Sequence, residues 1–260
     1  MEPLGKNIGG YRGETLDLPA VLRDLAQAAA SHHWQGDIIP LDYGAAAPPS
    51  RFIAYRRPAA SPRLRLYLSA GIHGDEPAGP LAALQLLRED RWPTDAALWF
   101  CPCLNPTGFP LSRRENVLGI DINRDYRHFE SAEARAHVAW LQDQPPFDLG
   151  ICLHEDWESR GFYVYELNPG RRPSLAAAIV AAVARVCPIE RAPLIDNWPA
   201  DNGVIRPRLN PEDRPRWAEA IYLITHKARL TCTLEAPSDF PLPTRVAALV
   251  TGVRAILAAL

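Results

Sequence analysis

The chain has 260 residues and a formal net charge of −2, with 47% hydrophobic and 22% charged residues. This balance is ordinary for a soluble globular protein, and the length suits one domain over residues 1–260 with a sizeable core. Because no long basic stretch occurs, nucleic acid is excluded as an expected partner. The start lacks a basic segment before an apolar run, and the apolar run 175–186 is too short to span a bilayer, so we expect neither a secretory signal nor a membrane partner.

The predicted elements alternate between helix and strand from the N-terminus on. A helix over 18–33 precedes two strands, 37–43 and 51–56, which the Ala- and Pro-rich stretch 44–50 joins as a hairpin. The near-continuous apolar run 64–70 is typical of a strand buried on both faces, as at the centre of a mostly parallel sheet.

The same alternation continues to the end of the chain. We predict helices over 77–90, 131–143, 173–186, 214–225 and 243–259, and strands over 97–103, 148–154, 162–167 and 229–235. Ser131 is the predicted N-cap of its helix. The pattern indicates an α/β fold: a three-layer sandwich with a mixed, mostly parallel central sheet and helices on both faces.

The chain contains five cysteines, an odd number. Cys101, Cys103, Cys152 and Cys232 lie in apolar, strand-like runs, where buried free thiols are common. The C-x-C pair at 101 and 103 has no second pair to complete a zinc cage. We therefore expect reduced thiols and a cytoplasmic protein.

Polar side chains that suit chemistry follow or end four of the predicted strands. His73 and Glu76 follow one strand, Asn105 follows the next, His154 ends another and Glu235 ends the last. In open α/β sheets, ligands bind just beyond the carboxyl ends of the strands. We therefore expect these side chains to meet at one edge of the sheet.

The first candidate is a metal site. His73 and Glu76 are three residues apart in HGDE and can reach one point, and zinc accepts imidazole nitrogen and carboxylate oxygen at about 2.0–2.2 Å. Read separately, Glu76 could complement a helix dipole and His154 could be a solvated strand cap. Two histidines and one glutamate, with water in the fourth position, are a known catalytic set, so the three together favour a zinc site.

With these motifs the chain resembles the M14 family of zinc carboxypeptidases, including its neighbours that act on acylated amino acids. The matching stretches are HGDE (73–76), NPTGF (105–109), RENVLGIDINRDY (114–126), LHE (153–155) and TLEAP (233–237). They cover the chain from residue 71 to about residue 237 in the family's order. As a set they are highly specific, although H-x-x-E alone is not.

The resemblance implies a role for each matching position. It makes His73, Glu76 and His154 the ligands of one zinc ion, Glu235 the general base, Arg114 the stabiliser of the oxyanion, and Asn123 and Arg124 the grip on the substrate's terminal carboxylate. The chemistry suits these residue types, because a bound zinc ion lowers the pKa of its water to about 7 and a carboxylate can accept the water's proton. The planar fork of an arginine can donate two parallel hydrogen bonds to a carboxylate.

Two features depart from the family pattern. Glu155 and Asp156 follow His154 where larger carboxypeptidases have a small polar residue, so we expect extra negative charge beside the metal, which would tune the water or favour a cationic substrate. Tyr222 is a candidate for the family's mobile tyrosine by rough position only. The segment 188–230 matches nothing residue by residue.

The leading hypothesis is a zinc metallocarboxypeptidase that hydrolyses the C-terminal peptide bond of a peptide. The alternatives are an N-acyl amino-acid deacylase, similar to aspartoacylase and succinylglutamate desuccinylase, and a non-catalytic binding module on the same fold. A module predicts that a ligand or the base is missing, and none is; a bacterial wall-peptide amidase is a variant of the first hypothesis. The expected partner is a peptide or acylated amino acid with a free carboxylate.

Overall fold

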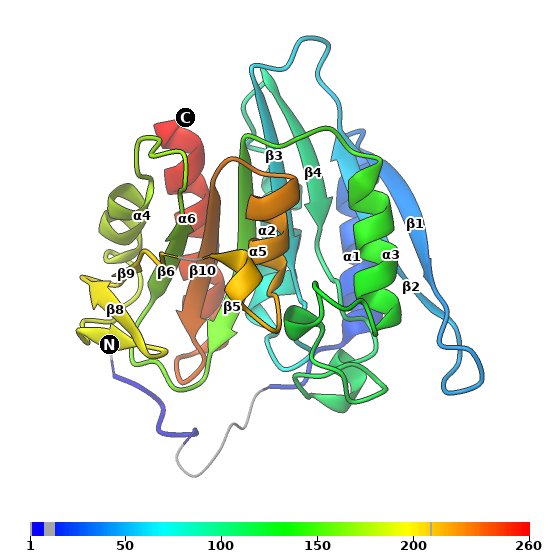
Figure 1. Ribbon diagram of the computed structural model, residues 1–260, viewed down its shortest axis with the longest axis horizontal. Coiled ribbons are helices and arrows are strands. Elements are labelled where there is room, and N and C mark those ends of the chain that lie inside the picture. The colour runs from blue at the N-terminus through cyan, green and yellow to red at the C-terminus, as the bar shows by residue number, and fades with distance from the viewer. Residues whose placement is uncertain (1, 8–13, 209) are drawn as a thin grey trace.

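A computed structural model describes residues 2–7, 14–208 and 210–260 of the chain (Figure 1). The expected domain over 1–260 includes residues 1, 8–13 and 209, which lie outside the described residues. Its extent remains a prediction.

A ten-stranded sheet forms the middle layer, in the order β1-β2-β4-β3-β5-β10-β6-β9-β8-β7. Its strands are β1 (Gln35–Leu41), β2 (Ser50–Arg57), β3 (Leu64–Ala70), β4 (Ala96–Cys101), β5 (Leu149–Asp156), β6 (Tyr163–Leu167), β7 (Leu194–Ile195), β8 (Trp198–Asp201), β9 (Val204–Ile205) and β10 (Thr231–Pro237). The central strands β4, β3, β5 and β10 are parallel to one another. The mixed sheet is confirmed, and the predicted parallel character holds at its centre, whereas β1, β2, β7 and β8 pair antiparallel with their neighbours.

Helices cover both faces of the sheet, as predicted (Figure 1). One layer contains α1 (Leu18–Ser31), α2 (Ala78–Glu89), α4 (Ala176–Val183) and α6 (Leu242–Ala259); the other contains α3 (Ala132–Gln142) and α5 (Glu219–His226). Successive side chains of β3 point to opposite faces of the sheet. Leu66 and Leu68 pack into a first core, beneath α1, α2, α4 and α6, and Tyr67 packs into a second core, beneath α3 and α5. The molecule is therefore a three-layer α/β sandwich.

The largest difference from the predicted elements lies before α5. The helix predicted from residue 214 begins only at Glu219, because the segment ahead of it runs alongside the loop that carries Asn123 and Arg124. The amide of Tyr126 donates to the carbonyl of Trp217, and Asp125 forms a bridge with Trp217. Pairing with another segment thus replaces the local helical bonds here.

Helix α6 is long and apolar enough to cross a membrane by length and composition, a feature that the sequence prediction overlooked. In the structure it packs against α2, α4 and β10. Leu249, Val253 and Ile256 are buried in the core, and so is Arg245. These contacts are those of a core helix in the sandwich. All five cysteines, Cys187 included, are buried and unpaired, as predicted for the other four.

His137 is buried in the second core and forms hydrogen bonds with two tyrosines. Tyr126 Oη lies 2.6 Å from His137 Nδ1, and Tyr67 Oη lies 2.9 Å from His137 Nε2. Because Tyr67 gives its only hydroxyl proton to Glu219 Oε1, 2.7 Å away, His137 must donate from Nε2 and accept at Nδ1. This is a neutral imidazole, and burial lowers the pKa of His137 to about 3.

The neutral state of His137 predicts a dependence of stability on pH. An unfolded histidine has a pKa of about 6.5, so between about pH 3 and pH 6.5 the side chain of His137 is protonated to a greater extent in the unfolded chain than in the folded one. The contribution of His137 to the free energy of unfolding is therefore present above pH 6.5 and lost as the pH falls, by at most about 1.4 kcal/mol per pH unit. We expect His137→Gln to flatten the curve in this window, measured by urea unfolding of metal-free protein. Parallel curves for the two proteins would contradict the assignment.

Candidate active site

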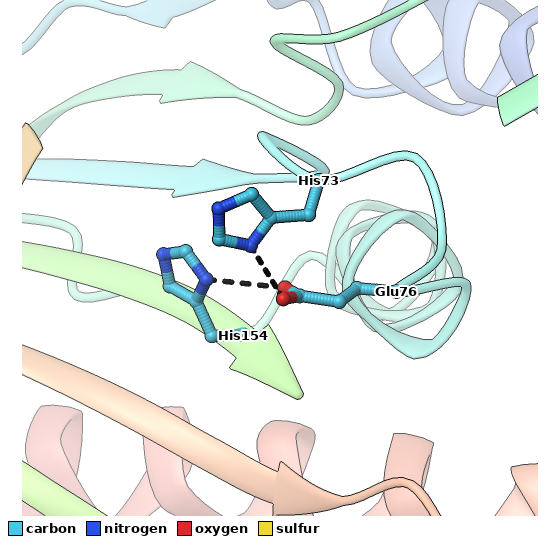
Figure 2. A group of neighbouring side chains, drawn as sticks. All are labelled: His73, Glu76 and His154. Carbon is cyan, nitrogen blue, oxygen red and sulfur yellow. Dashed lines mark hydrogen bonds and ion pairs between the residues drawn. The ribbon is translucent and has the colours of Figure 1, made fainter. Parts of the chain in front are cut away.

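Three buried side chains meet at the carboxyl ends of β3 and β5. His73 lies in the loop after β3, Glu76 lies two residues before α2, and His154 lies near the end of β5 (Figure 2). Glu76 Oε1 is 2.5 Å from His73 Nδ1, and Glu76 Oε2 is 3.1 Å from His154 Nδ1. One ligand atom from each residue lies within 4.8 Å of the other two. The predicted trio is therefore brought together.

The donor set of the trio fits a divalent metal ion such as zinc. Two imidazole nitrogens and a carboxylate point toward one another in a buried position, and this combination is used by catalytic zinc sites that keep one position open. Burial alone would raise the pKa of Glu76, but His73 and His154 hold it well below its usual range. Glu76 is thus an anion, which is the form that binds a metal.

Asp121 supports the trio from outside. Its Oδ1 lies 3.4 Å from His73 Nε2, the ring nitrogen that faces away from Glu76. Its Oδ2 accepts a hydrogen bond of 2.7 Å from Arg114 Nε. Burial opposes the charge of Asp121, but His73 and Arg114 hold its pKa well below the usual range. Such a carboxylate fixes the orientation of a ligating imidazole, a role that the sequence did not indicate for Asp121.

Arg114, the expected stabiliser of the oxyanion, reaches the trio. Its Nη1 lies 3.3 Å from His73 Nδ1 and 3.9 Å from Glu76 Oε1. The guanidinium is partly exposed toward the cavity that the trio also lines. It is placed to donate to an oxygen atom bound beside the trio.

The loops that carry these residues interlock through two glycines. A Cβ atom on Gly74 would lie 2.1 Å from the carbonyl carbon of Gly108, so the loops after β3 and β4 touch backbone to backbone. Asn105, predicted at this sheet edge, accepts from the amide of Gly108 (2.9 Å) and donates to the carbonyl of Arg114 (3.3 Å). It therefore fixes the loop that presents Arg114.

Glu235 stands next to the trio in the sheet. In the parallel pair of β10 and β5 it is the partner of His154, and on its other side it pairs with Tyr163 of β6. It lines the same cavity as the trio. Burial, reinforced by Glu76 and Asp156, raises its pKa to about 8, while His154 and Arg114 act in the opposite direction. A cation held by the trio would lower this pKa, which brings the group close to the value suited to proton transfer at neutral pH.

Asn123 and Arg124 lie on another wall of this cavity. The side-chain oxygen of Asn123 accepts from the amide of Glu219 (2.8 Å) at the start of α5. Its amide nitrogen has no hydrogen bond to the described residues. Arg124 is exposed and donates only to the carbonyl of Asn123 (2.9 Å); among residues 2–7, 14–208 and 210–260 it forms no ion pair. Both side chains can therefore donate to a ligand.

The cavity has a volume of about 970 Å³. Much of its lining comes from residues 190–198, 207 and 214–218, which lie within the segment that matched no family pattern, and from β6. Tyr163 donates to Asp156 Oδ2 (2.9 Å), and Tyr165 donates to Asp196 Oδ2 (2.7 Å). Other lining residues include Trp157, Arg160, Glu190, Leu194, Trp198, Arg214 and Arg216.

One expectation from the sequence holds for only one of its two residues, and another is wrong. The carboxylate of Glu155 pairs with the guanidinium of Arg245, whereas Asp156 adds a carboxylate that forms no ion pair with the described residues. Tyr222 is buried against Tyr126 and His226 and does not line the cavity. Near this position the cavity is lined instead by Ala218, Ala220 and Ile221.

Comparison with known proteins places this site in a family. The model of the succinylglutamate desuccinylase/aspartoacylase catalytic domain matches residues 62–236. A candidate metallopeptidase from Shewanella amazonensis SB2B is 26% identical, with a TM-score of 0.78 over 94% of this chain and 93% of that one. A metallo-carboxypeptidase from Pseudomonas aeruginosa, solved with (2-guanidinoethylmercapto)succinic acid, shares the fold at 18% identity, with a TM-score of 0.65 over 95% of this chain and 70% of that one.

Carboxypeptidase SOL1 from Arabidopsis thaliana is 30% identical over 104 residues. The match covers 32% of this chain and 21% of the plant protein, so the chain corresponds to about a fifth of that relative's length. The family model, in contrast, spans more than half of the chain and includes His73, Glu76, His154 and Glu235. The chain belongs to the succinylglutamate desuccinylase/aspartoacylase catalytic-domain family.

Proposed function

We propose that the chain is a zinc-dependent hydrolase that cleaves the C-terminal peptide bond of a peptide. The observation that carries this proposal is the convergence of five groups on one cavity. His73, Glu76 and His154 offer a metal site, Glu235 lies beside them, and Arg114 reaches the same point. Metal binding, proton transfer and charge stabilisation can therefore act on one bond.

The residues would divide the reaction as follows. A zinc ion held by the trio would supply water with a pKa of about 7. Glu235 accepts the proton of the attacking water and passes it to the leaving amine. Arg114 donates to the carbonyl oxygen as negative charge develops on it, and loss of one such donor typically costs about 2.7–4 kcal/mol of barrier.

The free carboxylate of the substrate is the proposed ligand of Asn123 and Arg124. Arg124 can donate two parallel hydrogen bonds to a carboxylate, and its guanidinium has no competing anion among the residues described. The amide nitrogen of Asn123 adds a third donor. This grip would hold the last residue of the substrate with its peptide bond at the trio.

The size of the cavity favours a peptide over a small acylated amino acid. About 970 Å³ is at the upper end of the range for small-molecule sites, and the space extends from the trio to Trp157, Leu194 and Trp198. The family match supports a second candidate, the hydrolysis of an N-acyl amino acid. Both candidates need the same metal, base and carboxylate grip.

A hydrolysis screen of the zinc-loaded protein separates the two candidates. Peptides that end in Arg, Lys, Phe, Leu or Glu are compared with N-acetyl-Asp and N-succinyl-Glu, each with a chelator control. Release of a C-terminal residue that stops with the chelator is the expected result. Cleavage of the acylated amino acids alone would establish the deacylase, and no cleavage of either class would contradict both candidates.

Arg124→Gln is expected to raise KM for a peptide with a free C-terminus by about 10- to 100-fold. The reason is the loss of charge-assisted hydrogen bonds to the carboxylate, each worth about 1.5–3 kcal/mol. The matched control is the same peptide with an amidated C-terminus. Amidation should weaken kcat/KM sharply for the unmodified enzyme and hardly at all for the variant; equal losses in both would remove Arg124 from carboxylate binding.

A further inference from the structure

A buried carboxylate behind the trio, that of Glu155, contacts segments next to Glu76 and Glu235. Glu155 directly follows His154, and its Oε1 accepts a hydrogen bond of 2.6 Å from the amide of Ala78, two residues after Glu76. Its Oε2 accepts from Ser238 Oγ at 3.5 Å, three residues after Glu235. One side chain thus links β5, the start of α2 and the end of β10.

The position of Glu155 at α2 has a physical reason. The first amides of a helix have no partner within the helix, and the positive end of its dipole attracts an anion. Pro77, the residue before α2, gives no side-chain cap. Glu155 supplies from β5 the cap that the helix lacks, and the short loop then holds Glu76 at a set distance from His154.

Arg245 completes the link from α6. Its side chain is fully buried, with Nη1 on Glu155 and Nη2 on Glu14. Burying two charges costs several kcal/mol each, and such pairs seldom add net stability over well-packed apolar residues. In this chain the pair connects the elements that carry the candidate metal ligands. A role in holding these elements in place therefore accounts for the buried charges better than a gain in stability does.

We propose that Glu155 and Arg245 are positioning residues for the metal site. They hold β5, the start of α2 and the end of β10 in the register that lets His154, Glu76 and Glu235 act on one point. The inference rests on the proposed function, because it assumes that the trio binds a metal. Supporting residues of this kind typically affect metal affinity by about 10- to 100-fold.

The test measures zinc affinity of the full chain by competition with a chromophoric chelator. Glu155→Gln keeps an acceptor for the amide of Ala78 but removes one of the two carboxylates that pair with the buried guanidinium of Arg245, so we expect it to lower the stability of the fold as well as the zinc affinity. The double variant Glu155→Gln/Arg245→Met removes both charges and keeps the fold testable by thermal melting. We expect the folded double variant to bind zinc about 10- to 100-fold more weakly and to lose kcat while KM stays nearly constant.

The matched control is Arg254→Met, which removes another ion pair of α6, with Glu89 at the far end of α2. Its zinc affinity should equal that of the unmodified chain. A double variant that melts cooperatively and binds zinc as tightly as the unmodified chain would overturn the positioning role and leave the proposed function intact. If the unmodified chain does not bind zinc, both the positioning role and the proposed function are overturned. If the double variant binds zinc more weakly but the unmodified chain hydrolyses no substrate, only the proposed function is overturned.

Discussion

His154→Ala is expected to abolish stoichiometric zinc binding. His154 provides one of three candidate ligands, and its Nδ1 faces Glu76 Oε2 at 3.1 Å in a buried site. Alanine leaves two ligands, and no other histidine, cysteine or acid of the described residues completes a cluster of three there. Zinc content per chain, measured by mass spectrometry after dialysis, should fall from about one to near zero, and hydrolysis should fall with it.

The control for this result is a histidine far from the trio. His33 is exposed and has a positive φ of 60°, a conformation that asparagine tolerates, so His33→Asn should retain full zinc content. Full occupancy in His154→Ala would remove His154 from the ligand set. It would also mean that the contact between Glu76 and His154 does not serve metal binding.

Glu235→Gln is expected to retain zinc and to lose turnover on the order of 10³-fold. Glutamine has nearly the same shape as glutamate but cannot accept the water's proton, and general acid–base catalysis typically contributes about 10²- to 10⁴-fold. Since Glu235 is the neighbour of His154 in the sheet but not a member of the trio, the metal site should remain intact. Steady-state kinetics on protein of known zinc content give the answer, and a near-normal kcat would exclude Glu235 as the base.

The centre of the fold could be predicted from the sequence because its strands are buried on both faces. The run 64–70 appears as β3 with the predicted bounds, and 97–103 and 148–154 contain most of β4 and β5. The small strands β7, β8 and β9 were not predicted. They are two to four residues long, too short for an alternating pattern, and they form only by pairing with one another and with β6.

The candidate site likewise has residues that could be predicted from the sequence and contacts that could not. His73, Glu76, His154 and Glu235 could be proposed because each belongs to a short motif at the end of a predicted strand. The supporting contacts could not, since Glu155 and Arg245 are 90 residues apart and no local pattern links them. Burial of both partners is a property of the packed sandwich, and a single sequence carries no signal of which distant charge will meet which.

The place of β10 in the sheet has a consequence for the order in which the site is assembled during synthesis. β10 is the last strand of the described chain, yet it lies between β5 and β6, near the middle of the sheet. The ribosome therefore releases all three candidate ligands before it releases Glu235. Insertion of a late strand between two earlier ones requires contacts between distant segments, which form slowly. Under the proposed function, a nascent chain could thus bind a metal ion before its base is synthesised, and we expect hydrolysis only after translation has passed β10.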